Sequence, residues 1–145
     1  MNRLQVETIK RSAKEFNEWR SQHMEEHIDL WKADLSKLNL EGINLDYAYM
    51  RGCNMEDSNL AGASLKRAML EDANLKLSNF SDCKMIQADM SGANLHRANL
   101  ENADLSLADL RQADLTEANL TGAVLKGADT TDADMRWAKL EKVEW

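Results

Sequence analysis

The strongest constraint on the fold is a hydrophobic period of five residues that runs from Ala33 to Trp145. Leucine, or less often methionine, occupies nearly every fifth position from Leu35 onward, and a small residue, mostly alanine, stands two positions earlier. The position between the two is Asn or Asp in most units. The repeat continues through 23 units without a gap. An unbroken short repeat of this kind predicts a solenoid.

A period of five residues fits neither an α-helix nor a flat strand. Five residues advance about 140° around a helix, so the leucines would not form a stripe. On a flat strand, five steps place the side chain on the opposite face. The chain must therefore turn in every unit, and four units would make one square coil of 20 residues. If coils stack at the strand spacing of ~4.8 Å, the 23 units form five to six coils in a rod about 27 Å long.

The repeat pattern Ala-(Asp/Asn)-Leu-x-x resembles the pentapeptide-repeat family. The resemblance covers residues 33–145, and its clearest units are Ala93–Arg97, Ala98–Asn102, Ala103–Leu105 and Ala113–Leu115. It implies an all-β solenoid, a right-handed quadrilateral β-helix, but it implies little about activity because a fold does not fix a function. The short stretch Phe16–Arg20 is also similar to the aromatic and arginine leaders of some bacterial members.

Residues 1–32 lack this period and show helical spacing instead. Their apolar residues fall on one side of a helix at Val6, Ile9, Ala13 and Phe16. Thr8 and Ser12 are candidate helix caps. An open solenoid end exposes apolar interior and unpaired backbone, so we predict that residues 4–30 form a helical cap on the rod. The expected organisation is one structural domain, with the cap at 1–32 and the β-helix at 33–145.

The formal net charge of −7 belongs entirely to the rod, because residues 1–33 carry equal numbers of acids and bases. Sorting the outward residues at a period of 20 gives four faces. The most acidic of them has a net charge of −4, and we call its acidic residues the acidic face: Glu71, Asp72, Asp89, Asp109, Asp129 and Asp132.

Within the acidic face, Asp89, Asp109 and Asp129 are expected to stack in one column. Like charges at strand spacing repel, so we expect them to raise one another's pKa values. Two interpretations remain open. These residues are either ordinary turn aspartates on a solvated face or an anionic recognition surface for a basic partner.

Four features of the rod lead to further predictions. A column of stacked amides is expected from Asn39, Asn59, Asn79, Asn99 and Asn119. Thr130 breaks the leucine rule, either as a tolerated core hydroxyl with a local partner or as a functional irregularity. Cys53 and Cys83 lie one and a half coils apart, beyond the ~7 Å reach of a disulfide. Reduced, buried thiols agree with a cytoplasmic location.

The C-terminal end of the rod shows no following helix or polar cap. Candidate end or dimer contacts are Trp137, Val143 and Trp145. Trp145 falls in the inward register, so we expect it to plug part of the last coil. An uncovered apolar end also suits an end-to-end homodimer.

His23 and His27 have the i, i+4 spacing of a helical metal pair but lack a third ligand, so we favour a structural role and predict no metal or cofactor.

Several function classes are disfavoured by composition. No apolar run approaches a membrane span, and no secretion leader is evident. The acidic balance argues against direct nucleic-acid binding. No nucleophile–base set or phosphate-binding glycine loop is present, so we predict that the protein is not an enzyme. We expect a protein-interaction module or scaffold that binds an unidentified protein partner through its rod faces.

The alternative comes from the family resemblance: a DNA mimic that protects or inhibits a type II topoisomerase such as gyrase through the acidic face. Charge density weakens this hypothesis. The acidic face offers about one net charge per ~6 Å of rod, whereas duplex DNA carries one per ~1.7 Å.

Overall fold

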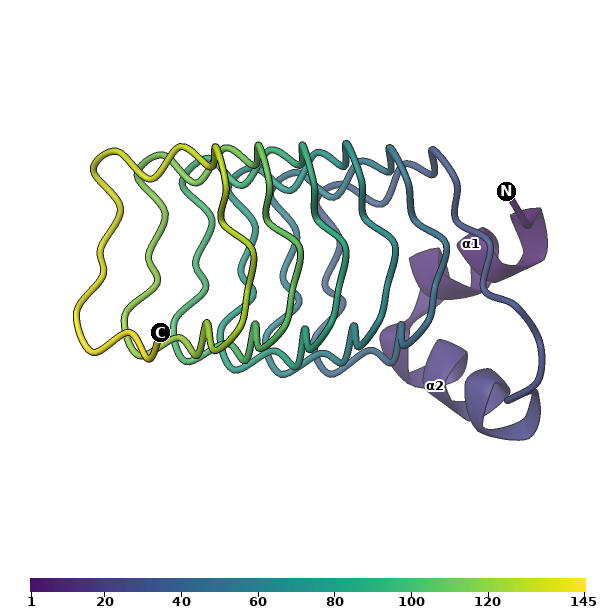
Figure 1. Cartoon of the computed structure of the whole chain (residues 1–145). Helices are drawn as coiled ribbons and strands as arrows, with labels where there is room; N and C mark the ends of the chain where they lie inside the picture. The colour runs from purple at the N-terminus through teal and green to yellow at the C-terminus, as the bar shows by residue number, and fades with distance from the viewer.

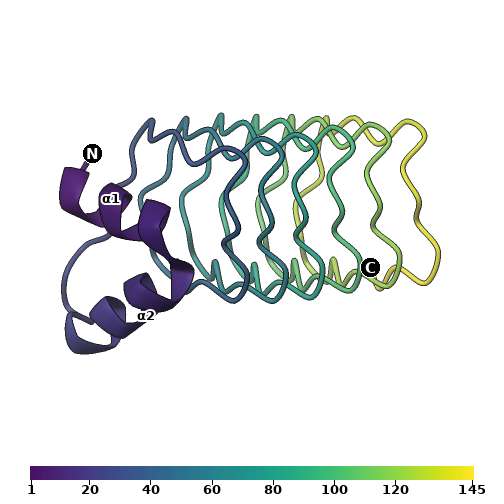
Figure 2. The ribbon, with the colours of Figure 1, turned by 180° about the vertical axis from the view of Figure 1, so that it is seen from behind.

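In the computed structural model of residues 1–145, square coils stack into a rod with two helices at one end (Figure 1). Parallel backbone bridges join residues 20 apart, from Asp29 with Tyr49 to Val124 with Glu144. Each side of a coil contributes one bridged residue, so the rod contains no longer strands. The 20-residue coil and the right-handed quadrilateral β-helix are confirmed. The view from behind shows the same stack, with the helices again confined to one end (Figure 2).

The corner of each unit uses a left-handed backbone conformation. Every fifth residue from Lys32 to Lys142 has a positive φ, and all six glycines occupy this position. At Gly42, φ is +66° and the N–H donates to Ala61 O of the next coil at 2.9 Å. Glycine adopts this conformation without steric cost. Proline, which fixes φ near −65° and has no N–H, cannot replace it, in agreement with the absence of proline from the chain.

The core is a continuous stack of inward side chains. Every central residue from Leu30 to Leu125 is at most 2% exposed, and the small residues two positions earlier line the same interior. Cys53 and Cys83 are buried within it and are not disulfide-bonded, as predicted. Burial raises the pKa of each thiol to about 12, so both remain protonated at neutral pH.

The predicted asparagine column forms a side-chain amide ladder. Asn59 Nδ2 donates to Asn39 Oδ1 at 3.0 Å, and the next three steps repeat this contact at 3.0, 3.1 and 3.0 Å, through Asn79, Asn99 and Asn119. Asn59 Oδ1 also accepts from the backbone N–H of Ala61 at 3.2 Å. The same oxygen thus stabilises both the turn and the stack, which explains the preference for Asn or Asp before the central residue.

The N-terminal residues form two short helices, α1 (Arg3–Arg11) and α2 (Ala13–Gln22). Ser12 ends α1 and caps α2, with its hydroxyl accepting from the N–H groups of Lys14 and Glu15. Thr8 does not cap a helix: its hydroxyl donates to Leu4 O at 2.9 Å. Neither helix has the length and apolar character of a membrane span.

The first coil begins upstream of Ala33, the residue at which we expected it to begin. Ile28 and Leu30 are at most 2% exposed, and Asp29 already bridges to the next coil. Ile28-Asp29-Leu30 therefore behaves as a repeat unit, and the helix expected over residues 4–30 ends at Gln22 instead. The reason is that the pattern of inward-facing apolar residues continues one unit upstream of Ala33. The backbone there pairs with the next coil instead of forming a helix.

Two side-chain amides close the exposed edge of the first coil. Gln5 Nε2 donates to His27 O at 2.8 Å, and Gln5 Oε1 accepts from the N–H of Asp29 at 2.8 Å. Asn17 makes the equivalent pair, donating to Gly42 O at 2.9 Å and accepting from Asn44 N at 2.8 Å. Each amide thus satisfies an N–H and a C=O at the edge where the ladder has no preceding coil.

Apolar packing holds the two helices on the first coil. Phe16 is completely buried, and Ile9 is 1% exposed within the same continuous core. His23 stacks on Trp19 with ring centroids 4.9 Å apart, and its Nδ1 lies 2.7 Å from Trp19 O. His23 therefore has a packing role.

The opposite end of the rod is open. Leu140 is 40% exposed and Trp145 is 62% exposed, although both fall in the inward register. The expectation that Trp145 plugs the last coil is therefore wrong, since its side chain stands largely in solvent. Thr130 lies in this same final coil and is only partly buried. Because this position is only partly buried, it tolerates a residue other than leucine.

Candidate interaction face

The acidic face is built from three columns of outward residues on one side of the rod. Backbone bridges join Asp89 to Asp109 and Asp109 to Asp129, so the expected aspartate column is present. The adjacent columns contain Glu71 in one and Asp72 and Asp132 in the other. Backbone hydrogen bonds between successive coils hold these columns in register, such as the bond from Asp72 N to Ser91 O at 3.0 Å.

The aspartate column is stabilised by donors two residues downstream. The N–H and hydroxyl of Thr131 donate to Asp129 Oδ1 at 3.0 and 2.6 Å, and these bonds lower the Asp129 pKa. Arg111 Nε donates to the two oxygens of Asp109 at 2.9 and 3.0 Å and lowers the pKa of that carboxyl. The expectation of raised pKa values is therefore wrong for these two residues, because hydrogen bonds to the charged form outweigh the like charge.

The other acids of the face are in varied environments. Asp72 forms an ion pair with Arg51 at 3.6 Å, with both side chains more than half exposed. The Oε2 atom of Glu71 is shielded from solvent and has no hydrogen-bond partner. Asp132 lines a shallow hollow that also includes Arg111. Two arginines thus lie among the six acids, and the face is not a continuous anionic strip.

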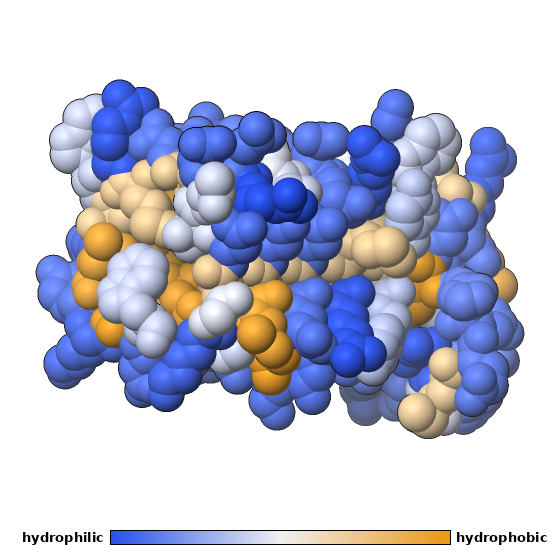
Figure 3. All heavy atoms as spheres, viewed as in Figure 1, coloured by the Kyte–Doolittle hydropathy of each residue, from blue (hydrophilic) through white to orange (hydrophobic).

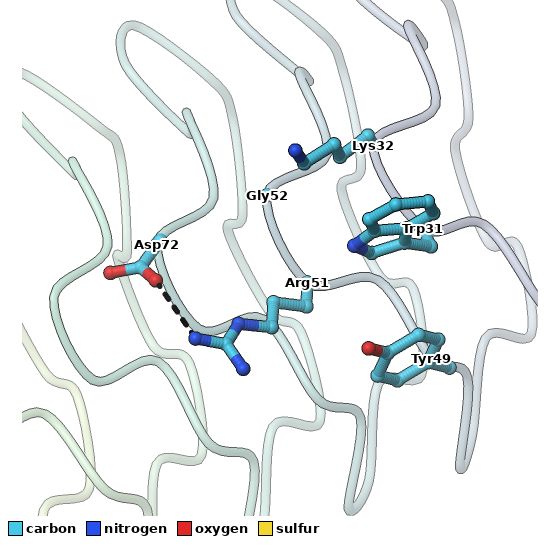
Figure 4. Close-up of a pocket in the computed structure, with 6 residues that line it drawn as sticks. All are labelled: Trp31, Lys32, Tyr49, Arg51, Gly52 and Asp72. Atoms are coloured by element: carbon cyan, nitrogen blue, oxygen red, sulfur yellow. Dashed lines mark ion pairs between the residues drawn. The ribbon is translucent and has the colours of Figure 1, made fainter.

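A recess lies at the helix-proximal end of this face, with a volume of about 450 Å³ (Figure 4). We call it the aromatic recess, and its lining residues are Trp31, Lys32, Tyr49, Arg51, Gly52 and Asp72. Figure 4 shows the rings of Trp31 and Tyr49 near one another, with the Arg51 side chain extending away from them toward Asp72. Sequence reasoning missed this site because it placed Trp31 and Lys32 in the cap. Extending the five-residue period back to Ile28 would have found it.

The three candidate end residues do not form one surface. Trp137 is 74% exposed at a corner position, with its ring 5.4 Å from the Arg136 guanidinium carbon. Val143 is partly buried against the core, whereas Trp145 is mostly exposed. Figure 3 shows apolar residues at the surface toward the end opposite the helices. That end therefore combines an open core with separate aromatic side chains.

One His–Thr–Asp group on the outer surface is joined by hydrogen bonds. The nearest arrangement to a catalytic set is on another face, where His96 Nδ1 lies 2.7 Å from Thr116 Oγ1. The Thr116 hydroxyl donates to Asp114 at 2.6 Å, so His96 must donate to Thr116 rather than take its proton. No group of three or more His, Cys, Asp or Glu side chains is placed to hold a metal ion.

The family profile described as pentapeptide repeats matches the chain over residues 26–60, 39–76, 73–112 and 108–143. The chain belongs to the pentapeptide-repeat family. The match begins before Ala33, in agreement with the additional unit at Ile28. A comparison with curated proteins gives no match.

Several solved structures are similar to this member of the pentapeptide-repeat family. The protein Rfr23 of the cyanobacterium Cyanothece 51142 is 26% identical, with 89% of this chain and 97% of that chain covered and a TM-score of 0.37. HetL of the cyanobacterium Nostoc sp. strain PCC 7120, involved in heterocyst differentiation regulation, is 22% identical. The match covers 90% of this chain and 93% of HetL, with a TM-score of 0.31. QnrB1, a plasmid-mediated fluoroquinolone resistance protein, is 15% identical. The match covers 83% of this chain and 70% of the QnrB1 chain, with a TM-score of 0.46. These scores are low, so nothing about activity follows from them.

Proposed function

We propose that this protein is a non-catalytic interaction module or scaffold of the bacterial cytoplasm that binds a protein partner through its rod faces. The observation that carries the proposal is the acidic face, whose aspartate column is fixed on a hydrogen-bonded backbone ladder. Charges held in place before binding favour selective, electrostatically steered association. The pKa values of Asp109 and Asp129 are lowered by hydrogen bonds to Arg111 and Thr131, which favour the ionised carboxylates and hold them in place.

Asparagine substitutions provide a test that removes charge and keeps the turn. In the amide ladder, Asn oxygens accept the same downstream N–H, so Asp89→Asn, Asp109→Asn and Asp129→Asn should fold normally. We expect this triple variant to lose a partner that the wild type captures from its native cells, as identified by mass spectrometry. The matched control carries three changes on a different face: Asp34→Asn, Asp114→Asn and Asp134→Asn. Identical partners for both triple variants would contradict a role for the acidic face.

A topoisomerase-directed DNA mimic is the second candidate, and the Asp89–Asp109–Asp129 column is the observation that favours it. The pairing of Arg111 with both Asp109 and Asp129 reduces the anionic field of that column. A gyrase supercoiling assay with and without a quinolone tests this candidate. Unchanged supercoiling and unchanged quinolone inhibition at micromolar protein would remove it.

An end-to-end homodimer is a separate proposal about the open end. The partly exposed inward residues Leu140 and Trp145 support it, because a second copy would cover them. Trp145→Glu should shift a dimer to monomer in sedimentation analysis, and the control Trp137→Glu should do so less because that side chain lies at a corner. A monomeric wild type at high concentration would contradict the proposal.

A further inference from the structure

The aromatic recess differs from the rest of this side of the rod, because its two cations outnumber its single acid, Asp72. Lys32 and Arg51 both line it, whereas the acids Asp89, Asp109 and Asp129 occupy coils farther from the helices. The face therefore changes from mixed charge with exposed aromatic rings at the helix end to mainly anionic toward the open end. A partner that follows this face must match both parts.

The two cations of the recess are accessible to a ligand. Lys32 Nζ lies 5.0 Å from the Trp31 ring centroid and forms no ion pair within the chain. The Arg51 ion pair with Asp72 is long, at 3.6 Å, and both side chains are more than half exposed. Such surface pairs are worth little, so an incoming carboxylate can compete for the guanidinium.

The recess also offers an apolar contact and free space. Trp31 is 44% exposed and Tyr49 is 37% exposed, so both retain ring surface that a ligand can cover. Gly52 lines the space between Lys32 and Asp72, and a Cβ there would lie 3.5 Å from Lys32 Cγ. Aromatic side chains bound against such rings commonly supply much of the energy of an interface.

We propose that the aromatic recess anchors an acidic, aromatic-containing segment of the protein partner. A carboxylate of that segment binds Lys32 and Arg51 in charge-assisted hydrogen bonds, and a neighbouring aromatic side chain packs on Trp31 and Tyr49. This inference rests on the proposed interaction function and specifies the chemistry of one part of the partner.

The geometry of the face also orients the partner. Five coil steps separate Trp31 from Thr131, which at strand spacing is about 24 Å, or about seven residues of extended chain. A segment of that length with acidic residues at one end and basic residues at the other complements the whole face. In the bound state, its basic end lies near Asp109 and Asp129.

An NMR titration with two synthetic peptides tests the recess directly. The probe is acetyl-Glu-Tyr-Glu-Tyr-Glu-amide, and the control peptide replaces each Glu with Lys. The chain has four tryptophans, whose indole N–H resonances can be assigned by substitution, with Trp31→Phe identifying the one in the recess. We expect the acidic peptide to move the Trp31 resonance and leave those of Trp19, Trp137 and Trp145 in place. Equal shifts with the basic peptide would overturn the proposal.

Charge reversal supplies the matched protein variants. Lys32→Glu with Arg51→Glu should weaken binding of the acidic peptide by tenfold or more. The control pair, Lys37→Glu with Lys76→Glu, reverses two positive charges at the same repeat positions on a neighbouring face and should bind as the wild type does. Unchanged affinity in the first pair would exclude the two cations as the anchor.

The outcomes for the recess and for the proposed function can be separated. If the Asp89, Asp109 and Asp129 triple variant loses the cellular partner but the Lys32 and Arg51 variant retains it, the interaction function stands and the recess proposal fails. If the acidic peptide binds the recess but neither variant changes partner capture, the recess binds acidic peptides without serving this partner, and the proposal fails in that form.

Discussion

The two ends of the rod are made from the same repeat but have different surroundings. At the helix end, Leu30 is fully buried, and two amide side chains pair with the backbone edge of the first coil. At the other end, Leu140 occupies the equivalent inward position and is 40% exposed. The repeat therefore specifies which way a side chain points, whereas the neighbouring coil or cap decides how much of it is buried.

The largest expected effect comes from breaking the packing of the cap. Phe16→Ala removes a completely buried ring that joins α2 to the core, and it should cost about 3–5 kcal/mol of unfolding free energy. Trp145→Ala at the open end should cost under about 0.5 kcal/mol, because that side chain is mostly solvated already. Urea unfolding followed by circular dichroism measures both. Equal losses would mean that the two ends are equally packed.

Exchanging the residue types at two inward positions on one side of the rod compares the packing of an interior coil with that of the last coil. Leu110 and Thr130 share a position in successive coils, but only Leu110 is completely buried. Leu110→Thr should destabilise the protein by about 3 kcal/mol, since it leaves a cavity and buries a hydroxyl. Thr130→Leu should change stability by less than about 1 kcal/mol, because the outer coil is incompletely covered. A large gain from Thr130→Leu in urea unfolding would show that the last coil is better packed than its exposure indicates.

The amide contacts of the cap should have an intermediate effect. Gln5→Met keeps the side-chain size but leaves the N–H of Asp29 and the carbonyl of His27 unpaired, which should cost about 1–3 kcal/mol. Hydrogen exchange should show the Asp29 amide exchanging about tenfold faster or more. Gln22→Met, at an exposed residue, is the control and should leave that rate unchanged. Protection of Asp29 that survives Gln5→Met would assign it to other contacts.

The smallest effect concerns two equivalent aspartate–arginine pairs. Arg111 lowers the pKa of Asp109 in the next-to-last coil, and Arg136 lowers that of Asp134 in the last. A depressed folded-state pKa stabilises the protein above the ordinary Asp pKa of about 3.9, and this contribution disappears as pH falls through the folded value. Arg111→Gln should therefore raise the Asp109 pKa and lower the stability only slightly at neutral pH, because the pair is exposed to solvent.

Carboxyl NMR titrations of both variants provide the measurement and the control. Arg136→Gln should raise the pKa of Asp134 and leave Asp109 unchanged, and the stability cost of either change should vanish at acid pH. A cost for Arg111→Gln that persists below the Asp109 pKa would mean that the arginine acts through packing instead of charge.

Much of the rod follows from the period, because each inward position obeys a local rule. The core, the asparagine ladder and the separation of Cys53 from Cys83 were all predictable in this way. The start of the rod was not, since Ile28 fits the helical spacing of the N-terminal residues as well as a repeat unit. The prediction of a raised pKa for Asp109 was wrong because like charges along a column are easier to recognise in the sequence than the hydrogen-bond donor on Arg111. The edge contacts of Gln5 join residues far apart in sequence, and no local pattern indicates such a pairing.

The asparagine ladder implies that this rod has two natural increments of length. Inserting or deleting one five-residue unit between Asn79 and Asn99 would preserve the leucine core but move every later residue onto a neighbouring face. Asn99 would then no longer stand above Asn79, and the amide chain would break at that step. A change of 20 residues would return every column to its own face. The interior therefore tolerates growth by quarter turns, whereas the outer surface keeps its pattern only through whole turns.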